Sequence, residues 1–363
     1  MHGLRLAQGF DFTERIEAPH RIAFKFAFEL FYNSIDQSSE KILYQEQCCE
    51  NNVPLAWSPD GRWLYHAADQ IYAFNVAEGS RRRITDFTVP YSINFELHCT
   101  PDNRRLVFSV SNETGRCLPE HLPIPKGGSF DFRADTRLCS IGVDGSDFYA
   151  FEGGRFYRWW HTSSTDPHRV LFFSYNKQLK CCELCAVGPR GEERLTQGEV
   201  PAESGQHFVL APDGRGLVYC YHDIEYEGLY FCELNNSEGI KISATGSQPA
   251  WSPQSDRVAF IDKQALWLWN RDTESTIELA DLPGPSYSHL SNGLDQRSVP
   301  SWSPDGRFIA FWLSKRTKPL LDDNLGFNVD DIFNAHGIVD LKQKKVWLLK
   351  EGYMEHVAWQ PLG

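Results

Sequence analysis

The chain has no run of apolar residues long enough to cross a lipid bilayer. Its start, MHGLRLAQGFDFTERIEAPHR, carries charges throughout and lacks the apolar core of a secretory signal. It also lacks a convincing nucleophile elbow, phosphate-binding loop or dinucleotide-binding glycine motif. From these absences we expect no membrane span, a cytoplasmic location, and neither serine-hydrolase nor nucleotide-dependent chemistry.

An excess of positive charge is missing as well. The 363 residues contain 36 Lys and Arg against 48 Asp and Glu, which gives a net charge of −12. This balance argues against the backbone of a nucleic acid as the main partner. The run Arg81-Arg82-Arg83 is short, and such runs are more often solvated strand ends than docking patches. We therefore expect no nucleic-acid partner.

The cysteines lack the spacing of a zinc cluster. Cys181, Cys182 and Cys185 are not followed by the second C-x-x-C pair that such clusters normally need. Cys181 and Cys185 also share one face of the strand expected at LKCCELCAV. Buried free thiols in a reducing compartment are the favoured interpretation, and a disulfide or metal site is the alternative.

Helical periodicity is nearly absent, and an internal repeat dominates the chain instead. Each copy has a short apolar strand, a turn whose Pro fixes φ and whose Asp and Gly suit tight-turn geometry, and a second strand rich in β-branched and aromatic residues. The plainest copies are WSPDGRWLYH (57–66), CTPDNRRLVFS (99–109), APDGRGLVYCY (211–221), WSPQSDRVAF (251–260) and WSPDGRFIAF (302–311). A degenerate copy, WWHTSSTDPHRVLFFS (159–174), and the C-terminal EHVAWQPLG (355–363) bring the total to seven.

These repeats predict an all-β chain that forms a single seven-bladed β-propeller over residues 1–363. Four antiparallel strands per unit of about 40–65 residues are typical of a propeller blade. The last copy ends after its first strand, so residues 20–47 are expected to complete the blade begun by residues 353–361. Insertions at 111–136 and 314–334 are expected between second and third strands, as candidate rims for binding.

The W-S-P-D-G copies resemble the repeats of TolB-type propellers over nearly the whole chain, whereas the Gly-His and Trp-Asp pairs of WD repeats are missing. This resemblance implies the fold and says little about function. The segment SGQHFVLAPDG (204–214) resembles a ligand-bearing segment of oligogalacturonate lyases, which are propellers with the same repeat. That resemblance implies a divalent metal in the central channel, with His207 at a ligand position. At another ligand position of that family this chain has Val299, and Arg297 stands in place of a flanking His.

The residue five before the turn Pro forms a column around the expected ring. Equivalent positions of related blades lie at similar heights, so their side chains converge on the channel. His161 joins the column because it precedes Arg169 by as many residues as Pro54 precedes Arg62. The members are Pro54, Glu96, His161, His207, Gln248, Val299 and His356.

Imidazoles with a Glu or Gln oxygen suit a divalent Mn, Zn, Fe or Ni ion. The predicted metal ligands are His161, His207, Gln248, His356 and Glu96, with contact to a substrate as an alternative role for His356. The opposing interpretation is that these are isolated polar residues in a wet channel.

Three further residues near the same rim are candidate catalytic groups. Arg158, Arg297 and Tyr353 are placed to remove an α-proton beside a metal-bound carboxylate, and solvated loop ends are the alternative. The sequence thus favours a metal-dependent lyase or isomerase acting on a small uronate-like substrate in the channel. The other hypothesis is a non-catalytic TolB-like scaffold that binds a protein partner through its insertions.

Overall fold

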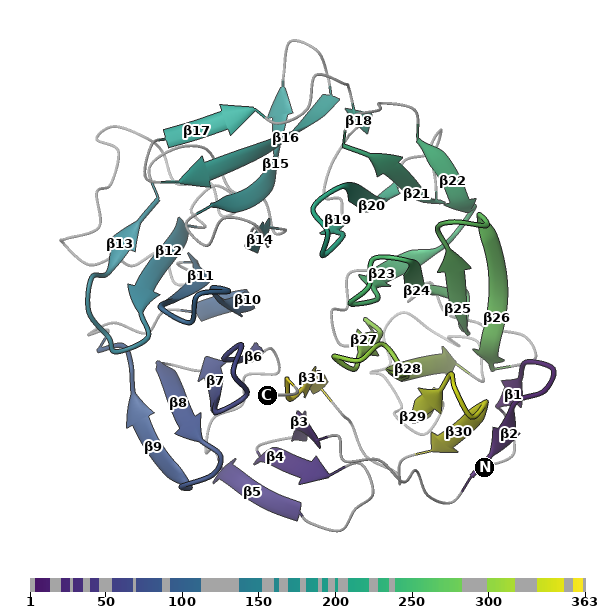
Figure 1. Ribbon diagram of the computed structural model, residues 1–363, viewed down its shortest axis with the longest axis horizontal. Coiled ribbons are helices and arrows are strands. Elements are labelled where there is room, and N and C mark those ends of the chain that lie inside the picture. Colours follow the sequence, from purple (N-terminus) through teal and green to yellow (C-terminus); the bar gives the residue numbers. More distant parts are fainter. Residues whose placement is uncertain are drawn as a thin grey trace, which may run out of the picture.

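In the computed structural model, the described residues form strands and turns arranged around one axis (Figure 1). The structure describes residues 4–13, 21–26, 29–34, 40–45, 54–67, 70–86, 92–111, 137–151, 160–162, 169–176, 181–188, 191–194, 200–201, 208–221, 228–234, 239–282, 299–316, 332–348 and 355–361. Within them the strands make seven sheets. The predicted all-β propeller is confirmed.

Four of the sheets are plain four-stranded units. The first has β6 (Leu55–Trp57), β7 (Trp63–Ala67), β8 (Ile71–Asn75) and β9 (Ser80–Arg83). The second has β10 (Ser92–Cys99), β11 (Arg105–Ser111), β12 (Arg137–Gly142) and β13 (Tyr149–Ala150). The fourth has β19 (Phe208–Leu210), β20 (Gly216–Tyr221), β21 (Gly228–Glu233) and β22 (Ile240–Ser243). The seventh has β31 (Glu355–Trp359), β3 (Arg21–Phe26), β4 (Glu29–Ser34) and β5 (Glu40–Gln45).

Three sheets carry a fifth strand that the repeat did not predict. The third has β14 (Trp160–Thr162), β15 (Val170–Asn176), β16 (Cys181–Gly188), β17 (Gly191–Arg194) and β18 (Val200–Pro201). The fifth has β23 (Ser247–Trp251), β24 (Arg257–Asp262), β25 (Ala265–Asn270), β26 (Ser275–Asp281) and β1 (Arg5–Leu6). The sixth has β27 (Ser301–Trp302), β28 (Phe308–Arg316), β29 (Ile332–Asp340), β30 (Lys345–Leu348) and β2 (Asp11–Phe12).

The repeated turn is held by its own hydrogen bonds. In the first sheet Ser58 Oγ donates to Asp60 Oδ1 at 2.6 Å and accepts the backbone N–H of Trp63 at 2.9 Å. The Gly61 N–H closes the turn on the Ser58 carbonyl, and Gly61 has a φ of 68°, which glycine adopts without strain. Ser303 and Asp305 repeat the hydroxyl–carboxylate bond at 2.6 Å. The side chains of the S-P-D-G motif therefore fix the link between first and second strands.

Hydrophobic packing closes the ring. The described core divides into seven clusters, and each contains residues of two neighbouring sheets. One cluster joins Ala23 of the seventh sheet to Leu64 and Phe74 of the first. Each sheet therefore buries both faces against its neighbours, because a single small sheet cannot bury a core alone.

A repeated tryptophan ties neighbouring sheets together. The tryptophan stands two residues before the turn Pro and donates its indole N–H to a backbone carbonyl of the preceding sheet. That carbonyl belongs to the residue three before the turn Pro of its own sheet. The four bonds are Trp57 to Ala358, Trp251 to Val209, Trp302 to Ala250 and Trp359 to Ser301, at 2.9–3.1 Å. The conserved spacing of the motif thus sets the relation between sheets as well as the turn.

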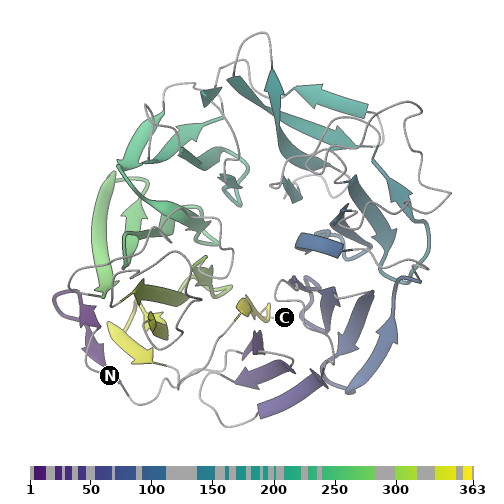
Figure 2. The same cartoon turned by 180° about the vertical axis from the view of Figure 1, so that it is seen from behind.

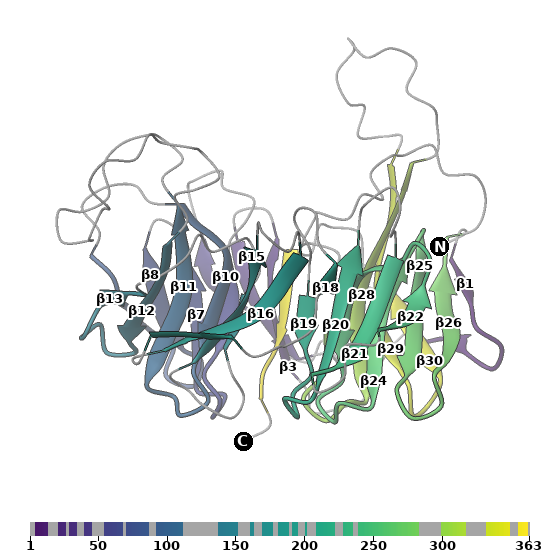
Figure 3. The ribbon, with the colours of Figure 1, turned by 90° about the horizontal axis from the view of Figure 1, so that it is seen from above.

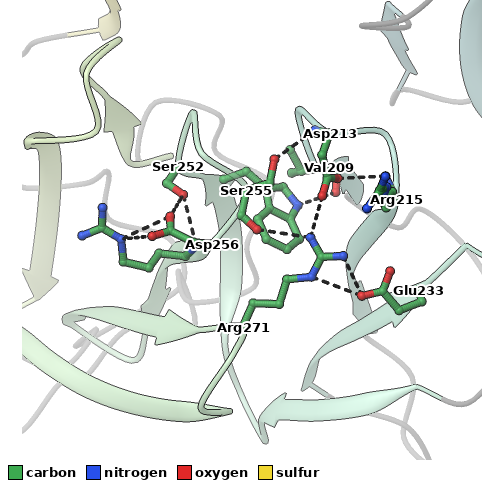
Figure 4. A network of polar contacts seen from close by, with 10 residues as sticks. Val209, Asp213, Arg215, Glu233, Ser252, Ser255, Asp256 and Arg271 are labelled. Carbon is green, nitrogen blue, oxygen red and sulfur yellow. Dashed lines mark hydrogen bonds and ion pairs between the residues drawn. The ribbon is translucent and has the colours of Figure 1, made fainter.

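An Arg-centred network adds charge to the contact between the fourth and fifth sheets (Figure 4). Arg271 donates to Asp213 Oδ2 at 2.9 Å and to Glu233 Oε1 at 2.6 Å. Burial opposes ionisation of Asp213, but the Arg215 N–H and the Arg271 guanidinium outweigh it and lower the pKa of Asp213. This network joins two sheets and is a structural feature.

The seventh sheet combines segments from far apart in the chain. Strand β31 pairs antiparallel with β3, with Trp359 opposite Ile22, and Gln360 Nε2 donates to the Gly61 carbonyl at 2.7 Å. Seen from behind, β31 lies near the axis and β3 to β5 lie farther out (Figure 2).

An N-terminal strap, residues 4–13, covers the outer edges of two sheets. Strand β1 pairs antiparallel with β26, and the Arg5 guanidinium forms a bidentate ion pair with Asp281. Strand β2 pairs parallel with β30, and Lys345 bonds Asp11 at 3.0 Å. The side view places β1 outside β26 (Figure 3). These added strands explain why the fifth and sixth sheets exceed the predicted four.

We expect Trp359→Phe to lower the free energy of unfolding by about 1–3 kcal/mol more than a matched control, because the Ser301 carbonyl loses its buried donor. Phe keeps the ring stacked on Phe308. The control is Trp267→Phe, which removes a similar indole stacked on Phe260. Urea unfolding of both variants measures the difference, and equal losses would contradict a role for the indole bond.

Candidate channel site

The candidate residues belong to the strands nearest the axis. In Figure 1 the inner ring is made by β6, β10, β14, β19, β23, β27 and β31, each the first strand of a repeat copy. Glu96, His161, Gln248 and His356 lie in four of these strands, and Val299 lies just before β27.

Three members of the column lie where the strand pairing is irregular. The register of β10 shifts between Ile93 and Leu97, around Glu96. That of β23 shifts between Ser247 and Ala250, around Gln248, and that of β31 shifts between Glu355 and Ala358, around His356. Such bulges re-aim side chains and are enriched beside active sites. Glu96, Gln248 and His356 therefore share a backbone feature in addition to their spacing from the turn.

Gln248 is the one predicted metal ligand whose side chain the structure describes. It is buried, with 7% of its surface exposed, and has a φ of 55°, a left-handed conformation uncommon outside glycine. Its backbone N–H points to the Cys220 thiol of the preceding sheet. Burial raises the pKa of that thiol to about 12, although the N–H acts in the opposite direction. The bulge thus turns the Gln248 backbone toward the fourth sheet.

The register places His161 in a different column from the predicted one. In the copies with a Pro turn, the second residue of the second strand lies opposite the residue two before that Pro. Leu64 thus faces Trp57, and Ile309 faces Trp302. In the third sheet that pair is Leu171 and His161. His161 therefore corresponds to the tryptophan position, and its alignment with Pro54 is wrong by three residues. The cause is the longer distance along the chain between paired residues: His161 and Leu171 are ten positions apart, whereas Trp57 and Leu64 are seven apart.

Several predicted site residues cannot be placed as side chains. His207, Arg158, Arg297 and Tyr353 lie outside the described residues. Glu96, His161 and His356 are described as backbone only. Among the described residues, no group of three or more His, Cys, Asp or Glu side chains is arranged to hold a metal. The ligand set therefore stays a prediction.

The structure reveals a buried histidine that the sequence did not single out. His336 pairs with Trp312 across the β28–β29 hairpin, and the two rings stack with centroids 5.4 Å apart. Burial lowers the pKa of His336 to about 4. The hairpin carries the predicted 314–334 insertion, of which residues 317–331 lie outside the described part.

The described cysteines are free thiols. Cys139, Cys185, Cys220 and Cys232 are buried and Cys99 is partly buried. This agrees with the interpretation of these cysteines as packed thiols. The part of the chain that the structure describes also contains no helix suited to crossing a membrane.

Comparison with known sequences gives a fold relationship and no established activity. Residues 213–318, less than half of the chain, match the family model of the dipeptidyl peptidase IV N-terminal region. An uncharacterized protein, Atu1656, of Agrobacterium fabrum is 24% identical over 263 residues, which cover 70% of this chain and 82% of that protein.

Two solved structures with TM-scores above 0.5 support the fold. A functionally unknown protein from Desulfotomaculum acetoxidans matches with a TM-score of 0.59 and 10% identity, covering 94% of this chain and 99% of that one. The oligogalacturonate lyase of Vibrio parahaemolyticus matches with a TM-score of 0.57 and 11% identity, covering 82% and 89%. TolB from Acinetobacter baumannii (12% identity, covering 94% and 67%) and an oligogalacturonate lyase in complex with manganese (11%, covering 92% and 85%) each match with a TM-score of 0.48. At these identities the likeness concerns the fold alone.

We expect His336→Phe to remove part of the acid sensitivity of folding. The folded-state pKa of about 4 lies below the ordinary 6.5, so the native protein binds this proton less readily than the unfolded chain. The contribution to stability is full above pH 6.5 and falls toward pH 4, by up to about 1.4 kcal/mol per pH unit. Urea unfolding from pH 7 to 4 measures it, and parallel curves for both proteins would contradict the assignment.

Proposed function

We propose that the chain is a seven-bladed propeller and a metal-dependent lyase or isomerase, with a divalent ion at the inner strands. The observation that carries the proposal is the set of bulges around Glu96, Gln248 and His356. His207 stands five residues before its turn Pro, Pro212, as the other three residues do before theirs, and it directly precedes β19. His161 is left out of the proposed set, since its register matches the tryptophan position.

The donors of this set suit the proposed ion. Two imidazoles, one carboxylate and one amide oxygen match the preferences of Mn, Fe, Ni or Zn. When bound, the ion would stabilise negative charge on a substrate carboxylate. A uronate is the substrate class that fits this chemistry, and an oligogalacturonate lyase is among the structures of similar fold.

The chain's own groups would supply positioning and proton transfer. Arg297 lies four residues before β27 of the sixth sheet and two before Val299, and its guanidinium would bind a carboxylate. Tyr353 lies three residues before His356 and Arg158 three before His161. We propose that the phenolate of Tyr353 or the neutral guanidine of Arg158 removes the proton next to the substrate carboxylate. The bond to the oxygen on the neighbouring carbon then breaks to form a C=C bond, and the leaving oxygen takes a proton from the other residue or from water.

The test is metal content after reconstitution with Mn, Zn, Fe or Ni, measured by elemental analysis. We expect one ion per chain in the unsubstituted protein and a large loss in both His207→Ala and His356→Ala. His161→Phe is the matched control, because it removes an imidazole from an inner strand but not from the proposed set. Circular dichroism and thermal unfolding establish that each variant is folded.

Three outcomes would refute this proposal. Metal retained by a folded double variant, His207→Ala with His356→Ala, would exclude the proposed ligand set. Metal lost only in His161→Phe would favour the predicted alignment of His161 with Pro54. A folded protein that takes up none of the four metals favours the scaffold hypothesis.

Formation of an unsaturated uronate, followed by ultraviolet absorbance, then tests the reaction in the metal-loaded protein.

A further inference from the structure

Strand β9 forms the outer edge of the first sheet, and its three arginines are exposed. The strand order β6-β7-β8-β9 ends there among the described residues. Arg81, Arg82 and Arg83 all lie at the surface, in a chain whose net charge is −12. The predicted solvated strand end is therefore a local concentration of positive charge on a sheet edge.

The arginine side chains are held by aromatic rings and ion pairs. The Arg81 guanidinium lies 3.8 Å from the centre of the Tyr72 ring, and Arg83 pairs with Asp86 at 2.8 Å. Arg82 lies on the other face of the sheet, where it donates to the Val143 carbonyl of the second sheet at 2.9 Å. Arg82 thus joins two sheets, while Arg81 and Arg83 share the opposite face.

The backbone of the same two residues points outward. The Ile84 N–H donates to the Ile71 carbonyl at 2.8 Å, so Ile84 and Ile71 form a hydrogen-bonded pair. Such pairs recur every two residues, so Arg82 and Ala73 form the next one. In an antiparallel ladder the intervening residues direct their N–H and C=O groups away from the neighbouring strand. Arg81 and Arg83 therefore present main-chain groups and positive charge along one edge.

The protein itself shows how such an edge is extended. Strand β2 of the N-terminal strap adds to β30, with the Asp11 N–H bonded to the Lys344 carbonyl at 3.0 Å. The Asp11 carboxylate meets Lys345 of the edge strand at 3.0 Å. An added strand with an acidic side chain against a basic edge residue is thus a contact already present in this fold.

We propose that β9 is a docking edge for an extended acidic peptide segment of a partner protein. The segment adds to the first sheet as an outer strand, and its alternate carboxylates face Arg81 and Arg83. Main-chain bonds supply affinity and the charge pairs supply selectivity. A peptide fits better than an acidic polysaccharide, because the outward amides of β9 match a peptide backbone.

The test uses a fluorescent peptide of alternating Glu and Val, with binding to the full chain followed by anisotropy. We expect Arg81→Gln with Arg83→Gln to weaken binding about tenfold, since two exposed charge pairs are lost. Arg82 is kept because it bridges to Val143. The charge-matched control is Lys241→Gln with Lys263→Gln, which removes two exposed cations elsewhere and leaves binding within about twofold.

A second peptide with N-methylated alternate amides separates strand addition from simple charge attraction. We expect it to bind about tenfold more weakly than its parent, because methylation removes the edge hydrogen bonds. Equal binding by both peptides overturns the proposal, as does undiminished binding by the arginine variant or no binding at millimolar peptide. Displacement of the peptide by polygalacturonate but not by unlabelled acidic peptide would also overturn it, in favour of a polysaccharide site.

Discussion

At four junctions between neighbouring sheets, an indole N–H donates to a backbone carbonyl of the preceding sheet. Trp57, Trp251, Trp302 and Trp359 make this bond from the same place in the repeat. At these junctions the directional bond fixes the height and angle of one sheet against the next, which non-directional apolar contact does not. The same four residues also precede the turn Pro, so one short motif specifies both the fold of a sheet and its relation to the next.

Much of the fold follows from that motif. Asp60 and Gly61 lie in the tight turn that the sequence predicts, and the inner strands coincide with the first strand of each copy. The hydrogen bonds of Ser58 were not predicted. The strap at residues 4–13 was not predictable, because two strands of two residues carry no periodic signal. Its position depends on Asp281 and Lys345, which are distant in sequence.

The candidate site was less accessible to sequence reasoning than the fold. Counting back from the turn Pro gives Glu96, Gln248 and His356 the same place in their strands, three residues before Cys99, Trp251 and Trp359, which all pair with the second residue of the next strand. Counting fails for His161, where the connection to β15 is longer and no Pro-Asp-Gly marks the start of the turn. The bulges were also invisible, since they arise from pairing with the second strand and leave no pattern in the first.

The pairing of Trp359 with Ile22 has a consequence for how the chain folds as it is made. The seventh sheet needs a strand near each end of the described chain, so it forms only after residue 359 has left the ribosome. Until then Phe308 of the sixth sheet lacks the packing of Trp359, and Trp57 of the first sheet lacks the Ala358 carbonyl that accepts its indole N–H. Such long-range pairing is slow, and the incomplete ring exposes apolar faces in the meantime. The seventh sheet therefore stays incomplete until β31 has been synthesised.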